Sequence, residues 1–139
     1  MNPDFFAYSE ANRQPVEQLY LLFGQRDIPA LLGTLTDDVD WLFYGPEIIP
    51  FAGHYQGREE VEQFFHKALD HIEFLEFEPQ EFFVTPHFVL VQGREKCRAK
   101  ATGRVWETSW AHVFTLEAGR ICKMREYYDT AAIADAFKP

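Results

Sequence analysis

Three stretches of the chain place hydrophobic residues at three- and four-residue steps, as amphipathic helices do. The first covers residues 15–24, where Pro15 is the expected first helical residue and Gly24 the expected end. A second, short helix is expected after Asp27, whose side chain is a suitable N-cap. The third begins near Arg58. Its apolar positions are Val61, Phe64, Phe65, Ala68, Leu69 and Ile72.

Most of the remaining chain has β-like sequence with alternating side-chain character. One strand is expected at residues 39–44, before the break at Gly45-Pro46. Four further strands are expected at residues 73–84, 88–101, 104–116 and 121–128. Asp129-Thr130 then reads most simply as the cap of a short closing helix at residues 130–137.

Between the first strand and the third helix, residues 46–57 place Ile48, Ile49 and Phe51 in a loop. Such a loop either closes over a pocket as a lid or fills one end of the core, and the sequence favours neither alternative.

Three N-terminal helices followed by antiparallel strands predict an α+β fold with the helices on one face of the sheet. We expect the sheet to curve around the third helix and to leave a cone with a central pocket. The chain shows no repeat, linker or low-complexity tract, so we expect one domain over residues 1–139.

The charge balance disfavours two classes of partner. The sequence has 22 Asp and Glu against 13 Lys and Arg, a formal net charge of −9. Such a chain repels nucleic acid and anionic membrane surfaces. We see no signal peptide and no apolar run near the ~20 residues of a membrane span. Cys97 and Cys122 have no paired spacing, so a cytoplasmic location is expected.

The last two strands suggest which side chains share the pocket. In residues 121–128, Cys122, Met124, Glu126 and Tyr128 alternate with Lys123 and Arg125, so the Met124–Glu126 face is expected inside. In the preceding strand, one face carries Thr108, Trp110, His112 and Phe114. We therefore predict a pocket wall built from these two faces.

Glu126 and His112 are the candidate acid–base pair within that wall. A carboxyl group among Met, Trp and Phe side chains has a raised pKa, which suits a general acid or base. His112 is the second titrating group. Glu126 could instead lie at an open rim, and His112 could be a core histidine bonded to the backbone. Glu95, between Arg94 and Lys96, is expected in solvent.

Other chemistries are not indicated by the sequence. The five histidines have no metal-binding spacing, and the two serines lie in no nucleophile motif. We therefore expect neither a metal nor a cofactor.

The element order and two segments, PFAGHYQGREEVEQFF (50–65) and WAHVFTLEAGRICKMREYYDT (110–130), resemble the NTF2-like superfamily. The nearest branch is the SnoaL-like, ketosteroid-isomerase-related proteins. The resemblance implies the cone fold and a homodimer through the outer sheet face. Strands that are apolar on both faces, with Val105, Ala111 and Val113 outside, also favour the dimer. It does not define one activity, because this fold hosts isomerases, cyclases, hydrolases and binding modules.

Three branches of the superfamily place different residues at the site. Resemblance to ketosteroid isomerase puts Phe43 where a catalytic carboxylate belongs, with Tyr20 and His112 near the oxyanion donors, so authentic steroid isomerisation is not expected. Resemblance to limonene-epoxide hydrolase matches Glu126 and Glu95 to its two acids. It puts Gly93 at the bridging arginine and Tyr44 near an asparagine. Resemblance to SnoaL-type cyclases matches Glu126, or less well Asp129, to the acid–base carboxylate.

These observations predict a protein that binds a small apolar molecule, cyclic or carbonyl-containing, with cofactor-free acid–base catalysis. The predicted catalytic residues are Glu126, His112, Tyr20 and Tyr44. The predicted ligand-binding residues are Trp110, Phe114, Met124, Tyr128 and Phe43. The alternatives are a non-catalytic binding module and a structural dimer whose cavity is filled by its own phenylalanines.

Overall fold

The structure is a computed structural model that describes residues 3–139, with side chains from residue 10 onward. Its elements, in chain order, are α1 (Pro3–Gly24), α2 (Ile28–Leu32), β1 (Leu35–Phe43), β2 (Gly53–Gln56), α3 (Gly57–His71), β3 (Ile72–Val84), β4 (Phe88–Ala99), β5 (Val105–Glu117), β6 (Arg120–Tyr128) and α4 (Thr130–Phe137).

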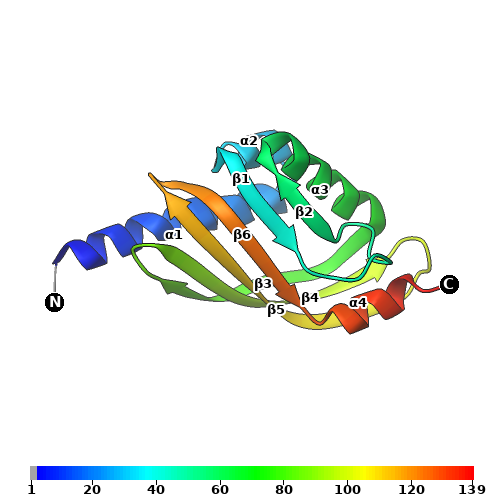
Figure 1. Ribbon diagram of the computed structural model, residues 1–139. Coiled ribbons are helices and arrows are strands. Elements are labelled where there is room, and N and C mark those ends of the chain that lie inside the picture. The colour runs from blue at the N-terminus through cyan, green and yellow to red at the C-terminus, as the bar shows by residue number, and fades with distance from the viewer. Residues whose placement is uncertain (1–2) are drawn as a thin grey trace.

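The six strands form one curved sheet in the order β2-β1-β6-β5-β4-β3. The β1–β6 pair is parallel and the other pairs are antiparallel. The helices α1, α2 and α3 lie on one side of the sheet, and α4 packs beside β4 and β5 (Figure 1). The predicted α+β cone is confirmed, with a fourth helix at the C-terminal end.

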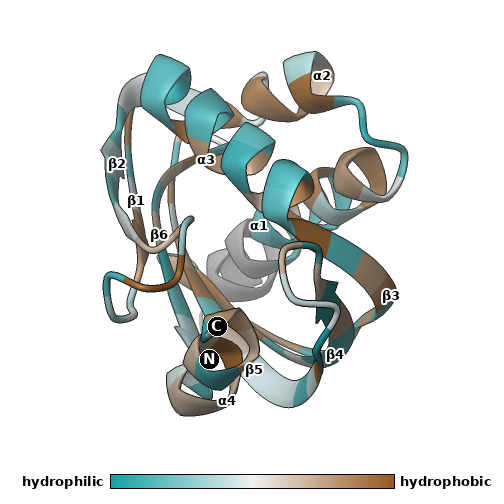
Figure 2. Cartoon of the chain, turned by 90° about the vertical axis from the view of Figure 1, so that its right-hand side faces the viewer, coloured by the Kyte–Doolittle hydropathy of each residue, from teal (hydrophilic) through white to brown (hydrophobic). Residues whose placement is uncertain are grey.

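The sequence of α3 explains why it covers the sheet. Its buried side chains are Val61, Phe64, Phe65 and Ala68, whereas its outward face is polar (Figure 2). Glu60 accepts a hydrogen bond from the backbone N–H of Gln56 at 3.0 Å and so satisfies one free donor at the helix start. Burial of one apolar stripe against the sheet holds this helix over the centre of the cone.

Helix α1 and strands β1 and β2 differ from the sequence predictions, and β1 begins at Leu35, four residues before its expected start. The first helix begins at Pro3, and Pro15 lies inside it. Proline is favoured in a first helical turn, so its position suggested a start, but here the helix continues and forgoes one backbone hydrogen bond. The short strand β2 was not predicted, because four residues (Gly53–Gln56) are too few to show a period-two pattern.

Residues 46–57 close one end of the cone, so the loop has features of both alternatives: it packs into the core and it covers the pocket. Ile49 and Phe51 are buried, and the ring of Phe51 lies 5.1 Å from that of Phe43 and 5.9 Å from that of Phe137. The Tyr55 hydroxyl donates to the Phe51 carbonyl at 2.9 Å. This end of the cone is therefore closed by packed rings.

The closing helix α4 agrees with the prediction. The Asp129 side chain accepts a hydrogen bond from the backbone N–H of Ala132 at 3.2 Å, so this residue is the N-cap. No helix within residues 3–139 is long and apolar enough to cross a membrane.

Candidate active site

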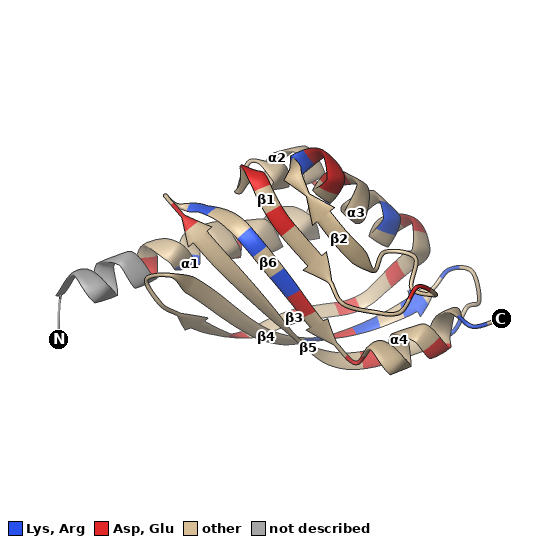
Figure 3. Ribbon diagram, viewed as in Figure 1, with Lys and Arg blue, Asp and Glu red and all other residues tan. Residues whose placement is uncertain are grey.

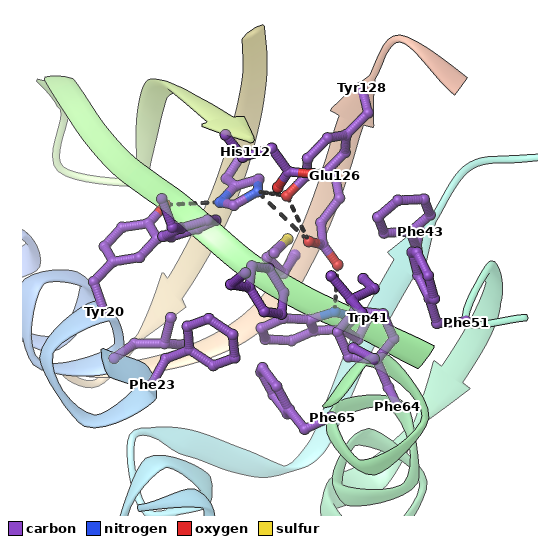
Figure 4. Close-up of a pocket in the computed structure, with 17 residues that line it drawn as sticks. Tyr20, Phe23, Trp41, Phe43, Phe51, Phe64, Phe65, His112, Glu126 and Tyr128 are labelled. Atoms are coloured by element: carbon purple, nitrogen blue, oxygen red, sulfur yellow. Dashed lines mark hydrogen bonds and ion pairs between the residues drawn. The ribbon is translucent and has the colours of Figure 1, made fainter. Parts of the chain in front are cut away.

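A cavity of about 60 Å³ lies inside the cone, between the helices and the concave face of the sheet. Its walls are almost entirely aromatic and aliphatic, with three titratable groups of particular interest, Glu95, Glu126 and His112 (Figure 4). The lining residues are Leu19, Tyr20, Phe23, Trp41, Phe43, Phe51, Phe64, Phe65, Ala68, Ile72, Phe74, Phe77, Glu95, His112, Met124, Glu126 and Tyr128. The space suits a few water molecules, whereas a cavity that accepts benzene measures roughly 150 Å³.

The sheet register brings Glu126 and His112 together. His112 on β5 pairs with Glu126 on β6, and both side chains point into the cone. Their exposed fractions are 5% for Glu126 and 3% for His112. His112 Nε2 lies 3.5 Å from Glu126 Oε1. The structure therefore places both residues in the cavity, as the alternation of the two strands predicts.

His112 also joins two tyrosines into a continuous hydrogen-bonded chain. Its Nδ1 is 2.8 Å from the Tyr20 hydroxyl, and its Nε2 is 2.8 Å from the Tyr128 hydroxyl. Tyr128 in turn donates to Glu126 Oε1 at 3.5 Å. The other carboxyl oxygen of Glu126 accepts from the Trp41 indole N–H at 2.8 Å. The chain links α1 to the last strand across the cavity wall (Figure 4).

Burial shifts the protonation of this chain. Desolvation raises the pKa of Glu126 to about 8, with a further increase from the charge of Glu95, against opposing hydrogen bonds from Trp41 and Tyr128. Burial lowers the pKa of His112 to about 3. It also raises the pKa of Tyr20 well above its usual value, as does the charge of Glu126. At neutral pH the hydrogen-bonded chain from Tyr20 to Glu126 is thus mostly uncharged, with a protonated Glu126 and a neutral His112 imidazole.

A neutral imidazole donates through one nitrogen and accepts through the other, so the two tyrosine neighbours can satisfy His112 in either tautomer. The Tyr128 hydroxyl donates to Glu126 when Nε2 carries the proton, and to Nε2 when Nδ1 carries it. The Trp110 indole stacks on its ring at 3.9 Å with an interplanar angle of 13°. This stacking and the two hydrogen bonds fix the orientation of the ring.

Glu95 is a second buried carboxyl, although its charged neighbours suggested a solvated one. It is 4% exposed, lines the cavity and accepts from the Trp106 indole N–H at 2.8 Å. Burial raises its pKa to about 7, against hydrogen bonds from Trp106 and Cys97. The alternation along β4 could have predicted that Glu95 is buried, because Glu95 lies on the same face as the buried Val91, Cys97 and Ala99.

Of the remaining predicted residues, four line the cavity, two lie behind its wall and one, Tyr44, lies elsewhere. Tyr20, Met124, Tyr128 and Phe43 line the cavity. Trp110 and Phe114 are buried behind its wall, where Trp110 stacks on His112 and Phe114 packs edge-on against it.

Tyr44 is not in the cavity. It is 44% exposed and stacks on Tyr127 with the ring centres 5.2 Å apart. Strand β1 ends at Phe43, so Tyr44 lies past the last position whose direction the strand determines.

Cys122 also departs from its predicted face. Ile121 and Met124 are both buried, three positions apart, because the β5–β6 register shifts between Thr115 and Leu116. The irregularity leaves the Cys122 thiol donating to the Thr115 carbonyl at 3.4 Å. Cys122 therefore contributes nothing to the cavity wall.

Gly93 explains why no side chain bridges the two buried acids. A Cβ atom there would lie 2.4 Å from the Trp110 ring and 2.5 Å from the Glu78 carbonyl. The Trp110 indole thus occupies the space above Gly93, and an arginine at this position is sterically excluded. Within the described part of the chain, no group of three or more His, Cys, Asp or Glu could hold a metal ion.

Comparisons with known proteins agree with this architecture. The SnoaL-like domain family matches residues 16–124. An NTF2-like protein from Burkholderia xenovorans LB400 is 31% identical, with a TM-score of 0.87 over 94% of this chain and 98% of that chain. An NTF2-like protein of unknown function from Burkholderia pseudomallei K96243 is 28% identical, with a TM-score of 0.83 over 93% and 98%.

TerC, co-crystallised with polyporic acid, shares the fold at 21% identity, with a TM-score of 0.82 over 93% of this chain and 99% of that chain. No curated protein matches the sequence. The family match covers most of the chain, and the fold and element order agree with it. The protein is therefore a member of the SnoaL-like family within the NTF2-like superfamily.

Proposed function

We propose that the protein binds a small, mostly apolar carbonyl compound and moves a proton on it without a cofactor, as an isomerase or a cyclase does. The observation that carries this proposal is the chain Tyr20–His112–Tyr128–Glu126 on the wall of an aromatic cavity. Such a chain holds an acid–base group and a hydroxyl donor on one surface, out of bulk water.

Glu126 is the proton-transfer group in this scheme. As a carboxylate it removes a proton from the carbon next to the carbonyl group, and as the resulting acid it returns that proton to another carbon. Since burial raises its pKa to about 8, roughly a tenth of the protein holds the base form at pH 7. The rate of proton abstraction should therefore rise with pH and level off above about pH 8.

Tyr20 is the donor for the oxygen of the reacting carbonyl. When Nδ1–H of His112 donates to the Tyr20 oxygen, Nε2 accepts the Tyr128 hydroxyl proton, which is then no longer shared with Glu126. In this tautomer the Tyr20 hydroxyl proton is free to point into the cavity and to stabilise a developing oxyanion. Its raised pKa keeps this hydroxyl protonated while Glu126 is ionised. His112 does not carry charge in this scheme; it orients Tyr20 and Tyr128.

The test is exchange of α-hydrogens for deuterium in small cyclic ketones, followed by NMR in deuterated buffer. We expect Glu126→Gln to reduce exchange by about 10²–10⁴-fold while ketone binding persists. Glu117→Gln, at the exposed turn between β5 and β6, is the matched control and should keep the wild-type rate. Wild-type protein that binds ketones without any exchange would support a non-catalytic binding module instead.

A homodimer through the outer sheet face belongs to the same proposal. Phe83, Leu90 and Val113 lie in register on neighbouring strands, and Phe83 is 48% exposed. Apart from His112, β5 carries no titratable residue between Thr108 and Leu116, and its ribbon is uncharged there (Figure 3). An apolar patch of this kind suits a second copy of the chain.

Sedimentation of Val113→Glu tests the dimer, with Gln63→Glu at an exposed position of α3, on the helical side of the sheet, as the control that should stay dimeric. A monomer with Val113→Glu and a dimer for the wild type are expected. A wild-type monomer would contradict the dimer.

A further inference from the structure

A groove of about 250 Å³ lies outside the cavity, between the C-terminal end of α1 and β3. Its walls are formed by Tyr20, Phe23, Gly24, Arg26, Phe74, Leu75, Glu76, Phe77 and Pro79. Four of these side chains also line the inner cavity: Tyr20, Phe23, Phe74 and Phe77. The two spaces are therefore separated by a wall that is one side chain thick.

This wall belongs to a less tightly held part of the cone. β3 is at the edge of the sheet, and its pairing with β4 is irregular between Phe74 and Glu76 and again between Pro79 and Glu81. Phe74 and Phe77 are only partly buried, whereas Phe64 and Phe65 on the α3 side are fully buried. Phe51 and its neighbours close another end of the cone, whereas on the α1–β3 side the groove and the cavity share their lining side chains.

Arg26 places a positive charge at the mouth of the groove. It lies in the turn after α1 with a positive φ of 58°, and its guanidinium donates to the Phe23 carbonyl at 2.6 Å. The guanidinium also lies over the rings of Phe23 and Phe74, at 4.6 and 5.3 Å from their centres. These contacts hold it against the shared wall.

The charge of Arg26 has no acidic partner among the described side chains. The ion pairs formed by those residues use Arg13, Arg58, Arg94, Arg98 and Arg125, but not Arg26. Glu76 is the acidic residue of the groove, and its carboxylate is 2.7 Å from Arg94. The guanidinium thus keeps N–H groups free for an anion in a chain whose net charge is −9.

We infer that ligands reach the cavity through this groove, and that the ligand is an amphipathic carboxylate whose anionic group binds Arg26 while its apolar part extends past Phe23, Phe74 and Phe77. The inner cavity alone is smaller than the space a six-membered ring requires, so a ring with a short carboxylate-bearing chain needs the groove as well. The two spaces join when a side chain of the shared wall, such as Phe77, rotates aside. This inference names the class of substrate and rests on the proposed function only for what happens after binding.

Binding of a matched series of probes tests the anionic part of the inference. The probes are ω-phenylalkanoates, from benzoate to 5-phenylpentanoate, and the corresponding neutral amides, with affinity measured by calorimetry. At least one acid should bind the wild type about tenfold more tightly than its amide, and Arg26→Gln should remove that preference. Arg13→Gln is the control, because Arg13 also lies over a ring, that of Phe82, but pairs with Glu10 and Glu17 outside the groove.

The result that overturns this part is an acid series that binds no better than the amides, or an acid preference that survives Arg26→Gln. Because the readout is affinity and not turnover, it is independent of the Glu126 chemistry. An inactive protein with the Arg26 preference would contradict the proposed function alone, and an active protein without the preference would contradict this inference alone.

A substitution that obstructs the groove tests whether ligands reach the cavity through it. Gly24 lines the groove, and a Cβ atom on it would have no neighbour within 4 Å, so Gly24→Trp is chosen to obstruct the groove and Gly24→Ala is its control. The tryptophan variant should bind both acid and amide at least tenfold more slowly or more weakly. Unchanged binding rates and affinities in Gly24→Trp would show that ligands enter elsewhere.

Discussion

Glu126 and Glu95 are two buried carboxyl groups with the same kind of immediate partner, a tryptophan indole, and different surroundings. Each accepts a hydrogen bond from an indole N–H at 2.8 Å, from Trp41 and Trp106 respectively, and each lines the cavity. From Glu126 the hydrogen bonds continue through Tyr128 to His112 and Tyr20, whereas the next hydrogen-bond partner of Glu95 is the Cys97 thiol. Burial, and after it the Glu95 charge, raises the pKa of that thiol well above its usual range, which keeps Cys97 protonated and unreactive.

Burial by itself does not make either carboxyl group a reacting group. Desolvation raises the pKa of both acids, to about 8 for Glu126 and about 7 for Glu95, so an altered pKa alone does not identify the reacting group. Only Glu126 is connected to hydroxyl donors that can act on the same ligand. We therefore expect Glu126 to react and Glu95 to tune it through its charge.

Replacement of each acid by glutamine should separate them most strongly. Glu126→Gln is expected to lower ketone exchange by about 10²–10⁴-fold, whereas Glu95→Gln should change it by less than about tenfold, through loss of a neighbouring charge. Exchange rates by NMR, with circular dichroism as the check on folding, measure both. Equal losses in the two variants would mean that the acids act as a single unit.

Both acids should make the free energy of unfolding decrease as the pH rises. Their folded pKa values lie above the ordinary 4.5, so the stabilisation is complete below about pH 4.5 and is lost as the pH rises through about 7 for Glu95 and about 8 for Glu126. At full extent this amounts to roughly 5 kcal/mol for Glu126 and about 3 kcal/mol for Glu95. Urea unfolding on both sides of this pH window should show it, and each glutamine variant should remove its own part.

His112 should have the opposite effect on stability, because its contribution is lost as the pH falls and not as it rises. Its pKa is lowered to about 3, so the neutral buried form stabilises the protein above about pH 6.5, and this contribution is lost as the pH falls toward 3. His112→Gln should flatten the acid side of the stability profile and leave the alkaline side unchanged. Flattening on the alkaline side would instead mean that His112 carries charge in the folded protein.

Gly93→Ala should disturb the packing between the two acid sites. The added Cβ would overlap the Trp110 ring, which supports His112, and a backbone carbonyl on β3, so we expect a loss of about 3 kcal/mol in the free energy of unfolding. Gly24→Ala, where the added atom meets nothing, is the control and should be neutral or slightly stabilising. Unchanged stability in Gly93→Ala would mean that Trp110 can move away freely.

Loss of one indole donor should have the smallest effect. Trp41→Phe and Trp106→Phe each remove the N–H group that bonds one acid, which should destabilise the protein by about 1–2 kcal/mol and raise the pKa of that acid. Carboxyl NMR titration should show an increase for Glu126 in the first variant and for Glu95 in the second. Increases for both acids in both variants would show that they are not separate sites.

Local sequence was sufficient for the fold and for half of the site. Alternation along β5 and β6 correctly put His112, Met124 and Glu126 inside, because every second side chain of a strand shares a face. It failed at Cys122, where a register shift breaks the period. Tyr44 was a candidate through the family resemblance, and it lies outside the cavity beyond Phe43, the last residue of its strand. Glu95 was misplaced because its charged neighbours outweighed the phase of its strand.

The size of the cavity could not be predicted from the sequence. It depends on how rings from distant segments meet, such as Phe51 against Phe43 and Phe77 against Trp110. No periodicity encodes those angles. The hydrogen bonds of His112 are hidden for the same reason, since Tyr20 is 92 positions away in the sequence.

The most direct test is the titration of Glu126 itself, followed by NMR of the carboxyl carbon in protein labelled at glutamate and assigned with Glu126→Gln. We predict a midpoint near pH 8, accompanied by a His112 ring that stays neutral down to about pH 3. A Glu126 midpoint near the ordinary 4.5 would place this carboxylate in contact with water and contradict its role as the buried proton-transfer group.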